Sequence, residues 1–436
     1  MNHIIFEEKV RTEYILGIFL LLRFSQHLVE RFLASSNRKY YSQKNKLTQA
    51  SEVLNINASD MEKTLTYSLD KSQFGSISSW ASVLISLGFI GFGGLGWLEQ
   101  QAQSMASTFT AEPSQTIVGL CFFLLVGILS YISSVPFELW NTFVIEEKHG
   151  FNKQTPKGFV LDLVKGTSIS IILGGGLLYA LLSIMESAGN YWWLGAWLLT
   201  FGFSLLTAWL YPTLLAPLFN KFEPLKPGEL KDKIFDLAQK IEFAADSISI
   251  MDASTRTSHG NAYFTGVFGK KKIVLFDTLI KSMNTSEIVA VLAHELGHFK
   301  LNHIRWSLIR SFFMTGFIFW LLSLCLPLID FYKAFNLSGV SNWAALVVFS
   351  LWFGPVGFLL QPITNHLSRK NEFAADAFAL EHIQNKKLLG DALLKLRENS
   401  HVMPISDPAF SAVYHSHPPL MERLEAMGYL NTAEQK

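Results

Sequence analysis

Long apolar segments recur along this chain at a length that suits a lipid bilayer. A helix that crosses the hydrocarbon core of a membrane needs about 20 mostly apolar residues. Seven segments meet this requirement: Tyr14–Leu33, Ile77–Leu98, Thr116–Trp140, Val164–Met185, Tyr191–Leu218, Ile304–Ile329 and Trp343–Leu367. The pattern therefore predicts a mainly α, polytopic membrane protein with seven transmembrane helices and the lipid bilayer as a partner.

The first and the last of these segments are the least uniform. Arg23 and His27 interrupt the first, and Pro355, Pro362 and His366 lie within the last. Polar groups and prolines are tolerated in membrane helices where neighbouring helices or water satisfy them. Both segments therefore remain predicted spans.

Charges along the chain predict its orientation in the membrane. Glu7, Glu8 and Glu13 precede the first apolar segment, where a secretory signal has net positive charge, so we expect a retained membrane helix. Cytoplasmic loops carry an excess of Lys and Arg. These residues are frequent after the first, third, fifth and seventh segments, and the loops after the second and fourth contain none. The N-terminus is therefore expected outside and the C-terminus in the cytoplasm.

Two polar regions are expected to face the cytoplasm, Asn220–His303 and Ser368–Lys436. In the first region, Ser247–Asp252 alternates polar and apolar residues like a short strand. Asn261–Phe268 and Lys271–Phe276 are typical of a β-hairpin with glycine in its turn. The two regions are good candidates to form one site together.

Helices are expected in both polar regions. Asn284 stands three residues before Glu287, which is the spacing of a capping box, and predicts a helix that runs through His298. The second region is expected to form helices at Arg369–His382 and Leu420–Met427.

These patterns divide the chain into two expected domains. Residues 1–219 are expected to form a membrane domain of five transmembrane helices. Residues 220–436 are expected to form a cytoplasmic α+β domain with a small β-hairpin or sheet. This domain includes the two further spans near residues 304–329 and 343–367.

Composition agrees with a membrane protein and narrows the range of partners. Hydrophobic residues make up 50% of the chain and charged residues 16%, whereas soluble domains carry about 25% charged residues. Lys and Arg number 36 against 35 for Asp and Glu, so no net charge attracts nucleic acid. Cys121 and Cys325 both lie in apolar runs, which argues against a disulfide and against a thiolate metal site.

The strongest chemical signal is the motif His294-Glu295-Leu296-Gly297-His298. On a helix, His294 and His298 lie one turn apart on one face, where both imidazoles can bind a single zinc ion. Zinc lowers the pKa of a bound water molecule and polarises a peptide carbonyl. Glu295 can then take the proton of this water and pass it to the leaving amine. The motif predicts a zinc peptidase with one Zn²⁺ per chain and a peptide substrate.

A catalytic zinc site has three protein ligands and one open position, so a third ligand is needed. Glu372 and Asp376 lie one helical turn apart with alanines between them, and small residues allow another helix to approach closely. Glu372 would complete a His₂Glu ligand set, and Asp376 could orient a ligating histidine.

Two further segments are candidates for substrate contacts. His417 and Arg423 could donate hydrogen bonds to the negative charge that develops on the substrate oxygen. An exposed strand edge could bind an extended peptide through backbone hydrogen bonds. The residues of that edge would be Asn261, Ala262, Tyr263 and Phe264.

The chain closely resembles the CAAX prenyl protease type I family, which consists of integral-membrane zinc metalloproteases. The resemblance extends over almost the whole chain and includes Leu69–Ser72, Glu146–Asn152, Asn261–Phe264, Ala293–Asn302, Ser368–Asp376 and His417–Leu420 with Arg423. Zinc chemistry does not require the segment Glu146–Asn152, so this segment is specific to the family.

The resemblance implies seven helices around a chamber in the membrane, with zinc at its cytoplasmic end. It implies that His294, His298 and Glu372 bind zinc and that Glu295 is the catalytic base. Supporting catalytic roles would belong to Asp376, His417 and Arg423. The strand that begins at Asn261 would align the substrate. The implied reaction removes the C-terminal tripeptide from a prenylated CAAX protein.

Two alternatives and the cellular location remain open at this point. Residues Asn431–Lys436 show no obvious dilysine-type signal of the kind expected in a resident of the endoplasmic reticulum, which favours a bacterial protein. We expect the inner membrane if the protein is bacterial and the endoplasmic reticulum if it is eukaryotic. A bacterial protein of this kind could serve membrane-protein quality control. A transporter or channel with a structural metal site would explain the apolar spans, but it would have no use for Glu295 beside the ligands.

Overall fold

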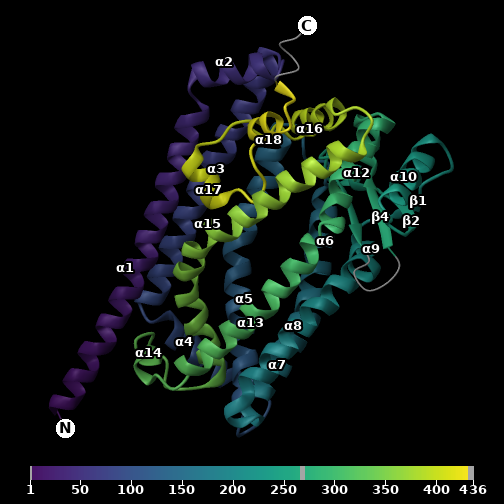
Figure 1. Ribbon diagram of the computed structural model, residues 1–436. Helices are drawn as coiled ribbons and strands as arrows, with labels where there is room; N and C mark the ends of the chain where they lie inside the picture. Colours follow the sequence, from purple (N-terminus) through teal and green to yellow (C-terminus); the bar gives the residue numbers. More distant parts are fainter. Residues whose placement is uncertain (1, 266–270, 431–436) are drawn as a thin grey trace.

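The computed structural model describes residues 2–265 and 271–430, and it shows a long helical bundle with a small sheet at one end (Figure 1). The two chain ends lie at opposite ends of the bundle. The glycine-containing turn of the expected hairpin and residues 431–436 lie outside the described residues.

Six helical segments among the described residues are long and apolar enough to cross a membrane. Three contain a π-helical turn (η1, η2 or η4) next to α-helices, whereas η3 and η5 are short 3₁₀ helices. The segments are α3 (Ala58–Gly91), α5 with η1 (Gln115–Trp140, Asn141–Glu146), α6 with η2 and α7 (Pro156–Ile169, Ser170–Gly174, Gly175–Ser187), η3 with α8, η4 and α9 (Gly189–Tyr191, Trp192–Leu210, Tyr211–Leu215, Ala216–Phe219), α13 (His303–Cys325) and α15 (Asn342–His382).

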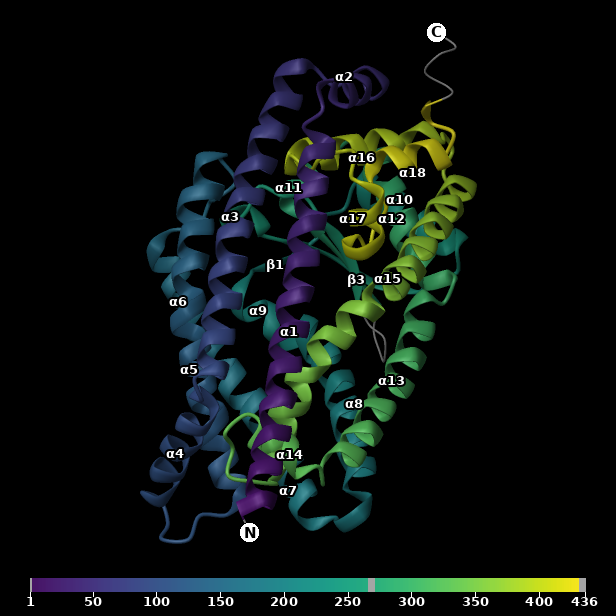
Figure 2. The ribbon, with the colours of Figure 1, turned by 90° about the vertical axis from the view of Figure 1, so that its left-hand side faces the viewer.

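The first predicted span lies within α1 (Asn2–Tyr41), which runs the length of the bundle (Figure 2). One of its polar residues, His27, faces inward: it is 1% exposed and its Nδ1 lies 3.4 Å from Ser79 Oγ of α3. Leu21 and Phe32, by contrast, are exposed. This helix is not among the six segments selected by apolar composition, so a total of seven spans stays a prediction.

The C-terminal end predicted for the second span, Ile77–Leu98, is wrong. Helix α3 stops at Gly91, and a separate helix α4 (Gly94–Ser107) follows. Gly93, between them, has a φ of 80°. This left-handed conformation is accessible to glycine at little cost, and it turns the chain where apolar residues alone suggest a continuous helix.

The last predicted span and the predicted helix Arg369–His382 form one helix, α15, of 41 residues. Pro355 and Pro362 lie inside it without ending it. In the membrane part, Trp343 of α15 packs against Phe122 of α5 with ring centroids 4.6 Å apart. A single helix therefore extends from the core of the bundle to the polar end of the molecule.

The sheet contains β1 (Phe222–Pro224), β2 (Ala245–Met251), β3 (Ala262–Thr265) and β4 (Lys271–Phe276) in the order β1-β2-β4-β3. Strands β2 and β4 are parallel, and β3 pairs with β4 in antiparallel fashion, with Tyr263 opposite Val274. The predicted strands Ser247–Asp252 and Lys271–Phe276 are confirmed by β2 and β4. The predicted strand Asn261–Phe268 is confirmed at Ala262–Thr265, and its residues 266–268 lie outside the described residues. Strand β3 lies at an edge of the sheet.

The remaining helices cover the sheet or close the two ends of the bundle. They are α2 (Lys44–Val53), α10 (Glu229–Lys240), η5 (Ala253–Thr255), α11 (Asp277–Ser282), α12 (Thr285–Lys300), α14 (Ile329–Lys333), α16 (Lys387–Ser400), α17 (Pro408–Tyr414) and α18 (Leu420–Ala426). Helix α12 packs on the sheet through a core that includes Ile273, Leu275, Ala293 and Leu296, all 0% exposed.

A close contact between α8 and α13 predicts a sensitive position in the bundle. A Cβ atom at Gly316 would lie 2.7 Å from the Trp197 ring, whose Nε1 donates a hydrogen bond to the Phe312 carbonyl. We expect Gly316→Val to destabilise the protein by about 1–3 kcal/mol through overpacking. Thermal unfolding in detergent measures the change. Gly202→Val on α8 is the control because that glycine has open space around it, and equal losses of stability in the two variants would contradict the packing assignment.

Candidate active site

The helix that carries the HExxH motif begins at a well-formed cap. Asn284 Oδ1 accepts a hydrogen bond from the Glu287 backbone N–H at 3.0 Å, and Glu287 Oε2 accepts one from the Asn284 N–H at 2.9 Å. This is the predicted capping box, and Lys395 Nζ adds an ion pair to Glu287 at 2.7 Å. The cap fixes the start of α12, so the motif begins ten residues later on a defined helical face.

Small residues bring α12 and α15 together beside the motif. A Cβ atom at Gly297 would lie 3.1 Å from Phe378 Cδ1 and 3.3 Å from the Cα and O atoms of Ala375. Ala375 is 0% exposed. The alanines of the Glu372–Asp376 segment therefore permit the close approach that the sequence predicts.

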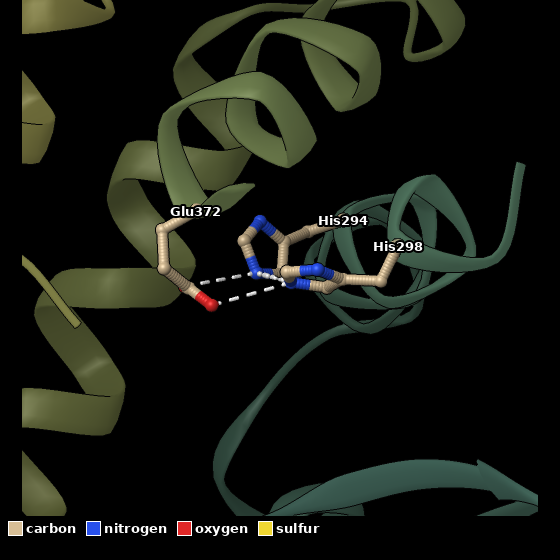
Figure 3. Close-up of side chains that lie close together, drawn as sticks. All are labelled: His294, His298 and Glu372. Carbon is tan, nitrogen blue, oxygen red and sulfur yellow. Dashed lines mark hydrogen bonds and ion pairs between the residues drawn. The ribbon is translucent and has the colours of Figure 1, made fainter. Parts of the chain in front are cut away.

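His294, His298 and Glu372 meet at this contact (Figure 3). The Nε2 atoms of the two histidines are 3.3 Å apart. Glu372 Oε2 lies 3.5 Å from His294 Nε2, and Glu372 Oε1 lies 3.3 Å from His298 Nε2. One potential ligand atom from each residue therefore falls within 4.8 Å of the others, which is the arrangement needed to hold one metal ion.

Asp376 and Arg423 surround the far side of His294. Asp376 Oδ1 lies 2.8 Å from His294 Nδ1, and Arg423 donates to both carboxylate oxygens of Asp376, at 2.9 Å from Nε and 2.6 Å from Nη2. Burial alone lowers the pKa of His294, but the neighbouring carboxylates of Asp376 and Glu372 raise this pKa to about 9. Asp376 is therefore placed to accept a hydrogen bond from Nδ1 of His294, while Nε2 of the same ring faces Glu372.

His303 also lies at the site, although the sequence analysis did not select it. Its Nδ1 atom lies 3.0 Å from Nδ1 of His298, so that one nitrogen donates a hydrogen bond to the other. A short turn places it there, because Asn302 has a φ of 59° and α13 starts at His303. The sequence signal that could have identified His303 is its position, only five residues after His298.

Glu295 is half-buried beside the two histidines. Burial raises the pKa of the Glu295 carboxyl above its ordinary value, and positive charge on His294 and His298 opposes the shift. A carboxylate with a raised pKa is a better proton acceptor than an ordinary surface glutamate.

His417 and Arg423 lie close to Glu372 but differ in their freedom to bind other groups. His417 Nε2 lies 3.4 Å from Glu372 Oε1, and the His417 side chain is 66% exposed. Arg423 is mostly buried, and Asp376 already engages two of its nitrogens. His417 is therefore the more accessible donor of the two.

The four predicted strand residues lie together at the sheet edge. The Asn261 carbonyl accepts a hydrogen bond from the Phe276 N–H at 3.0 Å, and its side-chain Oδ1 accepts one from Ala262 N–H at 2.8 Å. Ala262 is buried, whereas Tyr263 and Phe264 are half-buried. Helix α12 contacts β3, so this edge strand lies next to the helix that carries His294 and His298.

Comparison with family models divides the chain in two. Residues 37–221 match the N-terminal region of CAAX prenyl proteases, described as five membrane helices. Residues 224–431 match peptidase family M48. The fold and the two matches together define an integral, multi-pass membrane metallopeptidase.

Similar proteins extend over most of the chain. A CAAX prenyl protease 1 homolog of Arabidopsis thaliana is 39% identical over 85% of this chain and 88% of its own length. The corresponding homolog of Mus musculus is 34% identical over 95% of each chain. The crystal structure of S. mikatae Ste24p superposes with a TM-score of 0.88 at 32% identity, over 95% of this chain and 99% of that one.

The chain belongs to the CAAX prenyl protease family. This membership favours the peptidase interpretation over the transporter or channel alternative, because the match to the peptidase family covers the HExxH motif and Glu372.

The contact between α12 and α15 generates a prediction about the metal site. We expect Gly297→Val to push Glu372 away from the two histidines, because the added methyl groups would overlap Ala375 and Phe378. Metal content after dialysis should fall by more than half, and elemental analysis measures it. Ala377→Val at an exposed position of α15 is the control. Full metal retention in the Gly297 variant would show that the close approach does not control the site.

Proposed function

We propose that this protein is a zinc-dependent membrane endopeptidase that removes the C-terminal tripeptide from prenylated CAAX-type proteins. The observation that carries the proposal is the position of Glu372, which α15 brings next to both histidines of the HExxH motif. Curated relatives named CAAX prenyl protease support the substrate class.

The donor set fits zinc. Two imidazole nitrogens and one carboxylate oxygen are typical ligands of catalytic zinc, which keeps a fourth position open. Glu372 Oε2 is buried without a hydrogen-bond partner, and a cation held between Glu372 and the histidines would satisfy it. His294, His298 and Glu372 would hold this ion, and zinc when bound lowers the pKa of water and polarises the peptide carbonyl.

Glu295 is the proposed general base. It would accept a proton from the attacking water and deliver that proton to the amine of the departing tripeptide. Its partial burial keeps its pKa raised, which suits a group that must both take and give a proton.

Asp376 is the proposed orienting group for His294, and Arg423 would hold Asp376 in place through its paired hydrogen bonds. His417 is exposed next to Glu372 and would donate a hydrogen bond to the substrate oxygen as negative charge develops there. This division of roles is sharper than the sequence prediction, in which His417 and Arg423 were equivalent donors.

The edge of β3 is the proposed binding surface for the substrate backbone. Asn261, Ala262, Tyr263 and Phe264 would align an extended peptide along the edge strand, next to α12. The excess of Lys and Arg in alternate loops supports a cytoplasmic position for this region. The membrane would be the inner membrane of a bacterium or the endoplasmic reticulum of a eukaryote.

The division into a membrane domain of residues 1–219 and a peptidase domain of residues 220–436 is part of the same proposal. It places the boundary after α9, just before β1. The second domain would contribute α13 and the first part of α15 as two further spans.

Glu295→Gln tests the chemical role of the base. We expect the variant to bind the same amount of zinc as the wild type, while kcat on a farnesylated CAAX peptide falls about 10²–10⁴-fold because the proton acceptor is lost. Elemental analysis and release of the tripeptide measure the two quantities. Retention of most of the activity would overturn the assignment of Glu295. Equal cleavage of unprenylated peptides by the wild type would favour quality control instead.

His303→Ala tests whether this histidine supports His298. We expect zinc affinity to fall about 10–100-fold, because loss of an orienting hydrogen bond weakens a ligating histidine. Competition with a chelator measures the affinity. His382→Ala is the matched control, since His382 stacks on Phe378 at the end of α15 and bonds to the Phe378 carbonyl. Unchanged affinity in the His303 variant would remove His303 from the site.

A further inference from the structure

The segment Glu146–Asn152 has no part in the metal site, yet several hydrogen bonds fasten it to α3. Glu146 Oε1 accepts hydrogen bonds from Tyr67 Oη at 2.9 Å and from Lys71 Nζ at 2.8 Å. Asp70, on the same face of α3, pairs with Lys148 Nζ and His149 Nε2, each at 2.7 Å. Four polar contacts therefore join the segment to α3.

A glycine turn then brings Phe151 into the interior. Gly150 has a φ of 78°, and the Phe151 N–H donates to the Glu146 carbonyl at 2.9 Å. This is a helix-ending turn of the kind that glycine favours. Phe151 is 6% exposed as a result.

Phe151 lies at the centre of a ring cluster formed by four separate parts of the chain. Its ring is stacked on His259 at 4.8 Å between centroids, and it meets Tyr67 at 4.9 Å and His401 at 5.0 Å. His259 belongs to the segment that leads into β3, two residues before Asn261. Phe151 thus connects α3 to the start of the proposed substrate strand.

Three other contacts fasten the same leading segment to residues 152–153 and to α6. Asn152 forms an isolated antiparallel bridge with Thr257, and the Lys153 N–H donates to the Arg256 carbonyl at 3.3 Å. Arg256 also pairs with Asp162 of α6 at 3.0 Å. The start of β3 is therefore anchored to α3, to the segment after α5 and to α6, whereas the metal ligands belong to α12 and α15.

We propose that Glu146–Asn152 is a positioning element for the substrate strand, with Phe151 as its central positioning residue, and that it selects which peptide bond faces the metal. This inference rests on the proposed function. A strand advances about 3.3 Å per residue, so a small displacement of β3 relative to α12 changes the register of a bound peptide. Anchoring β3 to the membrane helices fixes the distance between a membrane-bound prenyl group and the bond that is cut.

The test compares Phe151→Ala, the milder Phe151→Leu and the conservative Phe151→Tyr on a farnesylated CAAX peptide. We expect KM to rise on the order of tenfold in the Ala variant, since loss of positioning by about 1 Å is costly. Mass spectrometry should also show cleavage one residue away from the normal bond. The Leu variant should show the same errors at lower frequency, and Tyr should restore the normal product. Zinc content should stay equal to that of the wild type.

Phe143→Ala is the matched control, because Phe143 pairs with Phe159 of α6 at 5.6 Å and should leave the cleavage position unchanged. A general loss of stability lowers the amount of product but does not move the cut. If both the Ala and Leu variants cut only the normal bond with unchanged KM, the positioning role is wrong. If the Ala variant fails to fold, the Leu variant alone tests the positioning role. Failure of the wild type to cut the prenylated peptide would instead count against the proposed function.

Discussion

The close packing of α12 on α15 is the contact on which the whole site depends. Gly297 has no side chain, and Ala375 has a small one, so the two helices approach within van der Waals distance. This contact brings Glu372 to the two histidines and Asp376 to His294. Because α15 continues into the membrane core at Trp343, the site is joined directly to the bundle.

His27 of α1 is a polar residue that faces the interior of the membrane part. It contacts Ser79 and Trp80 of α3, and its Nε2 atom is buried without a hydrogen-bond partner, while apolar residues such as Leu21 face outward. Ionisable residues within membrane helices usually face a protein interior or a polar cavity. A cavity of about 1080 Å³ lies between α3 and α5, with Ser79 and Glu138 in its lining. Ser79 therefore belongs both to this lining and to the contact with α1.

The sequence predicts those features that depend on local pattern. The capping box at Asn284 and the strand pair around Val274 follow from spacing within a few residues, and Glu372 follows from the need for a third ligand. The break at Gly93 was missed because apolar residues continue on both sides of it. His303 was missed because its contact with His298 depends on a turn at Asn302, which hydrophobic periodicity does not report.

The central claim is that His294, His298 and Glu372 bind one zinc ion. X-ray absorption at the zinc edge tests this claim most directly, in the purified wild-type protein and in the Glu372→Cys variant. The wild type should show two imidazoles with light-atom ligands and no sulfur. The Cys variant should add one sulfur at about 2.3 Å, which is the usual zinc–thiolate distance. A Cys variant that binds zinc with the wild-type spectrum would contradict the assignment of Glu372 as a ligand.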